Sequence, residues 1–184
     1  MADRPTARLP PPVATSPVLR LLPPAARHIL RGAPAVMAAA GEVLGLSLSM
    51  PACRASVHGA RAALWLGPDE RLLLAEEFSG PDTASRLAQG LRGAPHALVD
   101  VSHRQVAFAL AEPHAVTVLA AGCPLDLHPS AFPVGMCTRT VFAKAEIVLW
   151  RRADDSFQLE VWRSFAAYVS GVIAEAARDL APAV

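Results

Sequence analysis

The residues best suited to catalysis stand together after an apolar segment in the middle of the chain. Asp100, Ser102 and His103 belong to the residue types that serve in acid–base and nucleophilic catalysis. In an extended segment, however, adjacent side chains point to opposite faces, so Ser102 and His103 have the wrong geometry for a dyad. Short polar side chains also bond to the backbone where a chain bends between two strands. We therefore interpret this cluster as a structural turn and predict no catalytic residue on the chain.

The sequence also lacks the common signatures of nucleotide and metal sites. It contains neither GxGxxG nor GxxxxGK[ST], the spacings of the two common phosphate-binding loops. Its six histidines form no HxH or HExxH pair, so a metal site would need ligands from distant segments. We therefore predict no cofactor and no metal ion bound to this chain.

Three cysteines remain as possible chemical groups. Cys53, Cys123 and Cys137 are odd in number and have no CxxC spacing, which predicts reduced thiols in a cytoplasmic protein. A reactive thiol needs an electropositive setting, and Arg139 is the only nearby cation in the sequence. Because Cys123 lies on the apolar stripe of a predicted helix, we favour a buried, inert thiol. A redox or metal adaptor that uses Cys123 and Cys137 is the alternative.

The composition excludes several classes of protein. Of the 184 residues, 53% are hydrophobic and only 18% are charged, so apolar surface remains after a core is filled. No run approaches the roughly 18 apolar residues of a spanning helix, and no apolar segment follows the first residues as in a secretory signal. The net charge of +1 argues against a nucleic-acid binder. We expect a cytoplasmic protein whose surplus apolar surface contacts other subunits, and neither membrane nor nucleic acid.

The N-terminal segment is rich in proline. Seven of the 17 prolines fall within the first 24 residues, where they remove backbone donors and block regular structure. We predict that residues 1–25 form an extended arm, which is either a disordered tail or a segment that wraps a partner. Residues 26–184 are predicted to form a single domain.

From His28 onward, the hydrophobic periodicity alternates between that of strands and that of helices. The predicted strands are His28–Leu30, Ala62–Leu66, Arg71–Ala75, Ala97–Val101, Val106–Leu110, Cys137–Phe142, Glu146–Arg151 and Phe157–Trp162. The predicted helices run from Pro34 to Gly45, over Ala84–Leu91, over Val116–Cys123, and onward from a cap at Ser164. The last helix is predicted to bury one face, made of Phe165, Tyr168, Val169, Val172, Ile173 and Ala176.

The two predicted hairpins align with each other without a gap. Leu64-Trp65 matches Leu149-Trp150 and Asp69 matches Asp154, at a constant offset of 149 − 64 = 85 residues. We therefore predict an α+β fold made of two split βαβ, ferredoxin-like halves, at about residues 26–101 and 102–182.

The second hairpin carries our candidate residues for a subunit interface. Alternation places the aliphatic side chains of both strands on one face, beneath the last helix. The other face carries Trp150, Glu160 and Trp162, and rings beside charge are common at interface hot spots. For Trp150 an internal position is the alternative, because its repeat partner Trp65 could meet it where the halves join.

Several sequence blocks resemble the gamma-subunit family of heterotetrameric sarcosine oxidases. The similarity runs from about Leu64 to Leu180. The blocks are Asp100–Gln105, Gly122–Leu127, Phe132–Thr140, Val148–Arg151 and Leu159–Phe165, the last followed by Tyr168-Val169.

This resemblance implies an accessory subunit without an active site of its own. The complexes of that family oxidatively demethylate sarcosine to glycine, with formaldehyde or methylene-tetrahydrofolate and hydrogen peroxide as co-products. The implied partners are the alpha, beta and delta subunits. FAD and FMN are expected on beta, NAD and the tetrahydrofolate-binding region on alpha, and zinc on delta.

The segment Asp100–Leu127 also resembles the glycine-cleavage T-proteins, whose first domain has the same duplicated α+β build. The alternative function is therefore a free-standing folate-binding methylene or methyl transferase. In T-proteins an Asn-Asp pair commonly follows the helix, with the Asp beside the folate. Here Gly122-Cys123-Pro124 occupies that place and Asp126 comes only later. This departure argues against folate chemistry on the chain.

Overall fold

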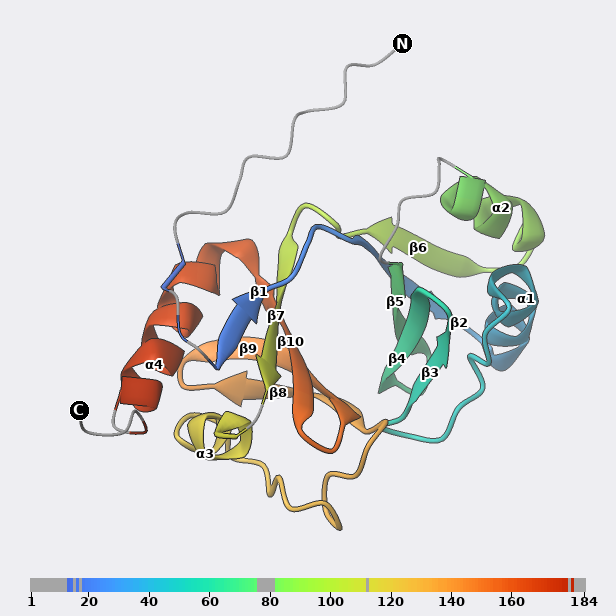
Figure 1. Cartoon of the computed structure of the whole chain (residues 1–184). Coiled ribbons are helices and arrows are strands. Elements are labelled where there is room, and N and C mark those ends of the chain that lie inside the picture. Colours follow the sequence, from blue (N-terminus) through green and yellow to red (C-terminus); the bar gives the residue numbers. More distant parts are fainter. Residues whose placement is uncertain are drawn as a thin grey trace.

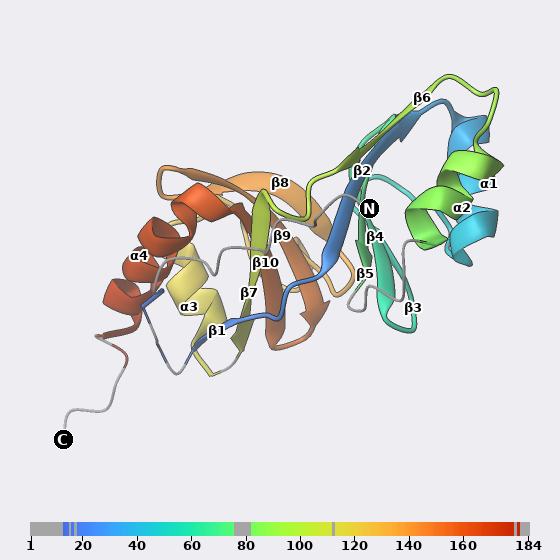
Figure 2. The ribbon, with the colours of Figure 1, turned by 90° about the horizontal axis from the view of Figure 1, so that it is seen from above.

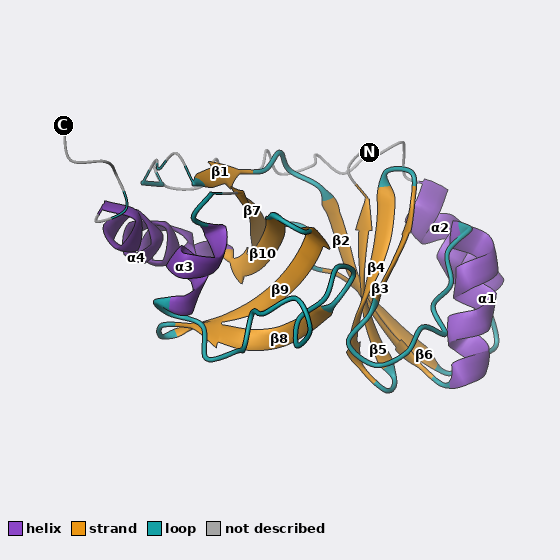
Figure 3. Ribbon diagram, turned by 60° about the horizontal axis from the view of Figure 1, so that its bottom comes forward, coloured by secondary structure: helices purple, strands orange, loops and turns teal. Residues whose placement is uncertain are grey.

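Two five-stranded antiparallel sheets face each other in the middle of the molecule, with helices on the outer side of each (Figures 1 and 2). The computed structural model describes residues 13–14, 16, 18–75, 82–111, 113–178 and 180. The order of layers is helix, sheet, sheet, helix, and the helices lie at the two ends of the view in Figure 3. The predicted α+β class is confirmed.

The first half of the chain builds one sheet and its two covering helices. Its elements are β2 (Ala26–Gly32), α1 (Pro34–Leu44), β3 (Ala55–His58), β4 (Arg61–Gly67), β5 (Glu70–Ala75), α2 (Asp82–Gly90) and β6 (His96–Asp100). The strand order is β3-β4-β5-β2-β6. Leu30, Ala63 and Leu73 on the outer face pack with Met37 of α1 and Leu87 of α2 to form a closed core.

The second half builds the other sheet in the same way. Its elements are β7 (Gln105–Ala111), α3 (Ala115–Ala120), β8 (Cys137–Phe142), β9 (Ala145–Ala153), β10 (Ser156–Trp162), the short 3₁₀ helix η1 (Arg163–Phe165) and α4 (Ala166–Arg178). The predicted packing beneath the last helix is confirmed. Leu149 of β9 and Leu159 of β10 share a core with Val169 and Ile173 of α4.

The two sheets have the same strand order, which supports the predicted duplication. The second sheet runs β8-β9-β10-β7-β1, and each strand corresponds in place to β3-β4-β5-β2-β6 of the first. Its fifth strand, β1 (Leu19–Leu21), comes from the N-terminal segment and pairs antiparallel with β7. The N-terminus therefore supplies the strand that β6 supplies in the first half.

This strand lies inside the range that we predicted to be an arm. Val18 and Leu19 are buried in the core of the second half, so the folded domain includes residues before the predicted boundary at residue 25. Proline density was a poor guide here, because Leu19-Arg20-Leu21 contains no proline and Pro23-Pro24 follow only after the strand has ended. Residues 1–12, 15 and 17 of the predicted arm lie outside the described residues.

Two other local predictions differ from the structure. The strand β3 was not predicted. The last helix begins with the tighter turn η1, so Ser164 lies within that turn instead of at a helix cap. In this arrangement Phe165 and Tyr168 are exposed, and Ala166, Val169, Ser170 and Ile173 form the buried face of α4.

The end of α1 depends on two glycines. Gly45 ends the helix in the left-handed conformation (φ 65°), as predicted for a C-terminal glycine. One turn earlier, Gly41 lies against the returning chain: its carbonyl accepts a hydrogen bond from the Leu46 amide (3.0 Å). A Cβ at position 41 would lie 2.6 Å from the Leu46 carbonyl oxygen. Glycine is therefore required here by close backbone approach.

We predict opposite effects for alanine at two helical glycines. Gly41→Ala lowers the free energy of unfolding by about 1–3 kcal/mol, because the new methyl group collides with backbone. Gly171→Ala in α4 is the matched control, because a Cβ there meets nothing within 4 Å. It raises the free energy of unfolding by about 0.5–1 kcal/mol through helix propensity. Urea denaturation measures both values, and equal effects of the two substitutions would contradict the argument.

Candidate functional site

The inner faces of the two sheets meet in a layer that is apolar in one part and polar in another. The apolar part consists of buried side chains from both sheets: Ala62, Leu64, Leu72, Leu74, Val101, Cys137, Val148 and Trp150. Backbone hydrogen bonds close the layer beside β3 and β8, where the amide of Cys137 donates to the carbonyl of Cys53 (3.0 Å). The candidate site lies in the polar part of this layer.

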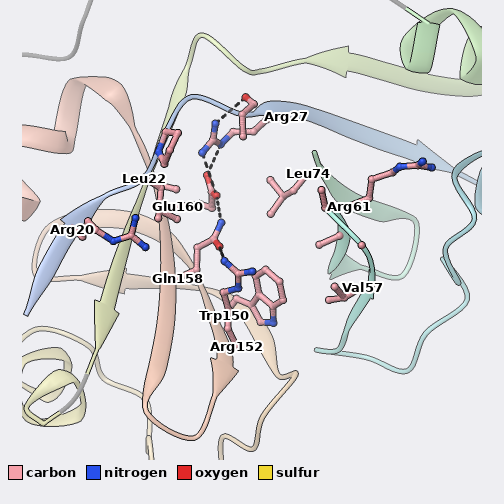
Figure 4. Close-up of a pocket in the computed structure, with 16 residues that line it drawn as sticks. Arg20, Leu22, Arg27, Val57, Arg61, Leu74, Trp150, Arg152, Gln158 and Glu160 are labelled. Carbon is pink, nitrogen blue, oxygen red and sulfur yellow. Dashed lines mark hydrogen bonds and ion pairs between the residues drawn. The ribbon is translucent and has the colours of Figure 1, made fainter. Parts of the chain in front are cut away.

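A buried ion pair occupies the polar part. Arg27 Nε, from β2 of the first sheet, donates to Glu160 Oε2, from β10 of the second sheet, at 2.6 Å. Only 2% and 0% of the two side chains are exposed. Gln158 Nε2 donates to the other carboxylate oxygen at 2.7 Å, and Arg27 Nη1 donates to the carbonyl of Ala25 at 3.0 Å (Figure 4). The charges are thus both paired and hydrogen-bonded, which an ion pair in a dry interior requires.

On one side of the ion pair lies a cavity of about 400 Å³. The turn between β3 and β4, the connection from β1 to β2, and the inner faces of β9 and β10 surround it (Figure 4). Its described lining is Arg20, Leu22, Pro23, Ala25, Arg27, Val57, Gly59, Ala60, Arg61, Ala62, Leu74, Ala107, Trp150, Arg152, Gln158 and Glu160. A concave, largely apolar space with a few convergent polar groups is the usual form of a ligand site.

Two polar groups in this cavity are held in place. The guanidinium of Arg152 lies over the Trp150 ring (5.0 Å to the centroid) and donates to Gln158 Oε1 at 3.3 Å. Among the described residues, Trp150 Nε1 is a buried donor without a hydrogen-bond partner. Leaving such a donor unmet costs about 1–3 kcal/mol. Trp150 thus lines the cavity with its ring while its indole N–H is enclosed by protein.

A second cavity, of about 410 Å³, lies on the other side of Glu160. It is lined in part by Gln105, whose Oε1 has no partner among the described residues, and by Trp162. Arg104 lies over the Trp162 ring at 4.8 Å. Arg139 pairs with Glu70 at its edge, at 3.1 Å between Nη1 and Oε2.

The structure separates our three candidate interface residues. Trp150 is 5% exposed and belongs to the apolar cluster between the sheets, together with the partly buried Trp65. This is the internal alternative that the repeat suggested. Glu160 is enclosed by Arg27 and Gln158. Neither side chain offers surface to a partner, because the second sheet has the first sheet against its inner face. Trp162, at the end of β10, is 40% exposed and stays a candidate.

The polar cluster after β6 forms a turn, in the way its residue types predict. The Ser102 amide donates to Asp100 Oδ1 at 2.8 Å, and Ser102 Oγ accepts a hydrogen bond from the Arg27 amide at 2.9 Å. Partial burial by itself raises the pKa of Asp100. The hydrogen bonds from Ser102 outweigh this effect and hold the pKa of Asp100 below its ordinary value. These bonds fix the chain between the two halves, directly beside the buried ion pair. The side chain of His103 is exposed.

Cys123 and Cys137 do not form a reactive pair. Burial raises the pKa of Cys137 to about 12, so the thiol stays protonated at neutral pH and is a poor nucleophile. Cys123 is buried in the core beneath α3 and α4, whereas Cys137 lies between the sheets. Arg139, the cation that we considered as an activator, pairs with Glu70. In the described part of the chain, no three His, Cys, Asp or Glu side chains gather in a way that could hold a metal ion.

The sequence interpretation missed Arg27, Arg152 and Gln158. A signal for Gln158 and Glu160 was present, since two polar residues alternate with Phe157, Leu159 and Val161 in a strand without charged neighbours on its other face. That pattern is typical of a solvated face as well. Only the first sheet, packed against this face, makes these residues part of an enclosed site.

Comparisons with known proteins agree with the resemblance that the sequence blocks indicate. A model of the sarcosine oxidase gamma subunit family matches residues 31–179. The gamma subunit of sarcosine oxidase from an Arthrobacter species is 36% identical over 143 residues, which cover 76% of this chain and 70% of that protein. The gamma subunit from Corynebacterium sp. (strain P-1) is 34% identical over 146 residues, covering 78% and 70%.

Two solved structures share the fold. Heterotetrameric sarcosine oxidase from Corynebacterium sp. U-96 contains a chain that matches with a TM-score of 0.84 at 30% identity, covering 90% of this chain and 86% of that one. Glycine cleavage system aminomethyltransferase T from Bartonella henselae matches with a TM-score of 0.63 at 16% identity, covering 84% and 44%. At that identity the second likeness concerns the fold alone. In the described part of the chain, no helix has the length and apolar character needed to cross a membrane.

The ion pair predicts a strong coupling between two substitutions. Glu160→Leu lowers the free energy of unfolding by about 3–5 kcal/mol, because Arg27 keeps a charge in the interior without a partner. The double variant Arg27→Met/Glu160→Leu loses much less, since neither charge is left buried.

Chemical denaturation of both single variants and the double variant measures this coupling. Glu175→Leu is the control, because Glu175 pairs with Arg178 on the surface of α4 and its loss costs about 0.5 kcal/mol or less. A double variant that loses the sum of both single effects would show that the two side chains act independently.

Proposed function

The chain belongs to the sarcosine oxidase gamma subunit family, and from this premise we propose that it is the accessory gamma subunit of a heterotetrameric sarcosine oxidase. The complex, acting in the cytoplasm, demethylates sarcosine oxidatively to glycine. Formaldehyde or methylene-tetrahydrofolate and hydrogen peroxide are its co-products. The observation that carries the proposal is the match of nearly the whole fold to a chain of such a heterotetramer, at 30% identity.

In this proposal the chemistry takes place on other subunits. The alpha, beta and delta subunits are the partners, and they carry FAD, FMN, NAD and zinc, together with tetrahydrofolate where methylene-tetrahydrofolate is the co-product. The groups on this chain that resemble catalytic residues have structural tasks: Ser102 bonds to the backbone of Arg27, and the buried Cys137 thiol stays protonated.

An exposed row of aromatic side chains supports a role as a subunit. Trp162, Phe165 and Tyr168, which we call the aromatic strip, follow one another at three-residue spacing from the end of β10 through η1 into α4. Between 38% and 40% of each side chain is exposed. Trp, Tyr and Arg are enriched in interface hot spots, and Arg104 stacks on Trp162. We propose that another subunit covers the aromatic strip.

The folate-dependent alternative is not supported at the position where T-proteins have an Asp beside the folate, because this chain has Cys123 there. In this chain that place follows α3, where the Cys123 amide donates to the Leu119 carbonyl at 2.8 Å. The Cys123 side chain lies in the apolar core between α3 and the second sheet. A buried thiol on the outer face of that sheet is not suited to bind a pterin.

The first test is the visible spectrum of the purified chain. We expect no flavin absorption from the chain alone, and flavin absorption with sarcosine-dependent peroxide formation once it is combined with its partner subunits. The complex without this chain is the control for its contribution to assembly. A stoichiometric flavin in the isolated chain would exclude an accessory role.

The second test concerns the aromatic strip. Trp162→Ala weakens assembly with the partner subunits by at least ~2 kcal/mol, because a half-exposed ring that a partner covers contributes strongly to binding. Thermal unfolding of the isolated chain stays nearly unchanged, since the ring is not part of a core. Affinity is measured by titrating the chain into the remaining subunits.

Val134→Ala is the matched control for this test. Val134 is 47% exposed and lies in the loop before β8, away from the aromatic strip. The proposal for the strip fails when Trp162→Ala assembles with unchanged affinity, or when the variant chain unfolds by itself.

A further inference from the structure

Two cysteines lie opposite each other where the edges of the two sheets are joined. Cys53 belongs to the connection between α1 and β3 of the first half, and Cys137 begins β8 of the second half. The amide of Cys137 donates to the carbonyl of Cys53 at 3.0 Å. The residue after Cys53, Arg54, pairs antiparallel with Met136, the residue before Cys137. The two cysteines are therefore neighbours across an antiparallel contact between the halves.

The backbone hydrogen bond limits how far apart the two Cα atoms are. The Cα of Cys137 is one covalent bond from its amide nitrogen, and the Cα of Cys53 is two bonds from its carbonyl oxygen. With standard bond lengths and the hydrogen bond of 3.0 Å, the two Cα atoms are at most about 7 Å apart. Disulfides join Cα atoms that are about 4.4–6.8 Å apart. The backbone of the two residues therefore has the spacing that a disulfide requires.

The side chain of Cys137 points toward the half that contains Cys53. Its Sγ lies 3.8 Å from the carbonyl oxygen of Trp65 in β4. The amide of the same Trp65 donates to the carbonyl of Arg54, the residue after Cys53, at 3.1 Å. Burial raises the pKa of Cys137 to about 12, and a negative charge on Cys53 adds to this effect. Such an effect of one thiolate on the other requires sulfur atoms that are near each other.

The two thiols differ in their access to solvent. Cys53 is partly exposed, whereas the side chain of Cys137 is completely buried between the sheets. The protonated thiol of Cys137 is a poor nucleophile toward a small oxidant, which therefore reacts with Cys53 first. Cys123 lies in the separate core beneath α3 and α4.

We propose that hydrogen peroxide converts Cys53 and Cys137 into a disulfide that links the two halves of the chain covalently. This oxidant is also a co-product of the oxidase reaction in the proposed function. The inference goes beyond that function, because it assigns a modification site to this chain. Without the oxidant, the cysteines remain free thiols.

The reaction begins at Cys53. Its thiolate attacks one oxygen of hydrogen peroxide, the O–O bond breaks, and the leaving hydroxide takes up the proton that Cys53 released. The sulfur of Cys137 then attacks the sulfenic sulfur of Cys53. The S–O bond breaks, and the leaving hydroxide takes the proton of Cys137 and becomes water. In total the two thiols lose two electrons and two protons, and the peroxide is reduced to two molecules of water.

The raised pKa of Cys137 does not prevent the second step. A thiol that is mostly protonated attacks slowly when it must first meet its target. Here the backbone contact holds Cys137 beside Cys53, and reacting groups held together behave as if they were present at very high concentration. Cys137 therefore reacts with the oxidised Cys53, although it does not react with the peroxide itself.

The full-length chain is reduced, freed of reductant and treated with a small excess of hydrogen peroxide. We expect its three free thiols to fall to one and its mass to decrease by that of two hydrogen atoms. The Tm rises by at least about 5 °C, because the disulfide closes a long loop in the unfolded chain. Dithiothreitol reverses all three changes. Thiol titration, intact-mass spectrometry and thermal unfolding measure them.

Single substitutions identify the two partners. Cys53→Ser and Cys137→Ala each abolish the loss of mass and the rise of the Tm, whereas Cys123→Ser, the matched control, retains both. Trypsin cuts after arginine and leaves Cys123 and Cys137 together in the peptide Gln105–Arg139. In Cys123→Ser, a disulfide between this peptide and Gly32–Arg54 therefore identifies the bond between Cys53 and Cys137.

Several results would overturn the proposal. They are three thiols that stay free after the peroxide treatment, oxidation of Cys53 to a sulfinic acid without a disulfide, and a disulfide that joins two chains or is lost in Cys123→Ser. If the substitution of the buried Cys137 unfolds the chain, Cys53→Ser is sufficient for the test, because Cys53 is partly exposed. The spectral test of the proposed function depends on none of these results.

Discussion

Arg27 and Glu160 lie 133 residues apart in the chain, on different sheets, and meet in the middle of the layer between them. Removing either charge from water is costly, and the cost is offset only when both side chains reach each other with good geometry. The two sheets must therefore face each other with β2 opposite β10. Ser102, in the segment that connects the two halves, accepts a hydrogen bond from the backbone amide of Arg27. The connecting segment therefore helps to position the ion pair.

The same pair divides the layer between the sheets. On one side of it, aliphatic side chains and Trp150 close the contact in the way of an ordinary core. Around the charges, however, polar side chains interrupt the apolar packing, and two cavities border Glu160. The layer joins the two halves, and it also contains Trp150 Nε1 and Gln105 Oε1, which have no hydrogen-bond partner among the residues that the structure describes.

The outer faces have a different physical character from the inner ones. Each sheet buries its outer face beneath two helices in a dry core, and α4 is further tied to the N-terminal segment by a hydrogen bond from the Ala14 amide to Ser170 Oγ at 3.1 Å. Since α4 buries Val169 and Ile173 on one face, Tyr168 stays exposed on the other. The aromatic strip begins at Trp162, which lines the second cavity beside Glu160, and continues through η1 onto this exposed face of α4.

The sequence by itself determined the local elements and the duplication. Hydrophobic periodicity and terminal glycines depend on neighbouring residues only, which is why α1 with its end at Gly45 and both hairpins were predicted close to their observed bounds. The equal spacing of Leu64-Trp65 and Leu149-Trp150 revealed the repeat for the same reason. The family could be predicted as well, because it is carried by contiguous blocks. The tertiary structure decided which face of each strand is enclosed. Gln158 and Glu160 alternate with apolar residues as on any solvated strand. They are buried only because the opposite sheet packs against them and places Arg27 within hydrogen-bond distance of Glu160. It also decided that Leu19–Leu21 completes a sheet, because strand pairing between residues 19 and 110 leaves no local pattern in the chain.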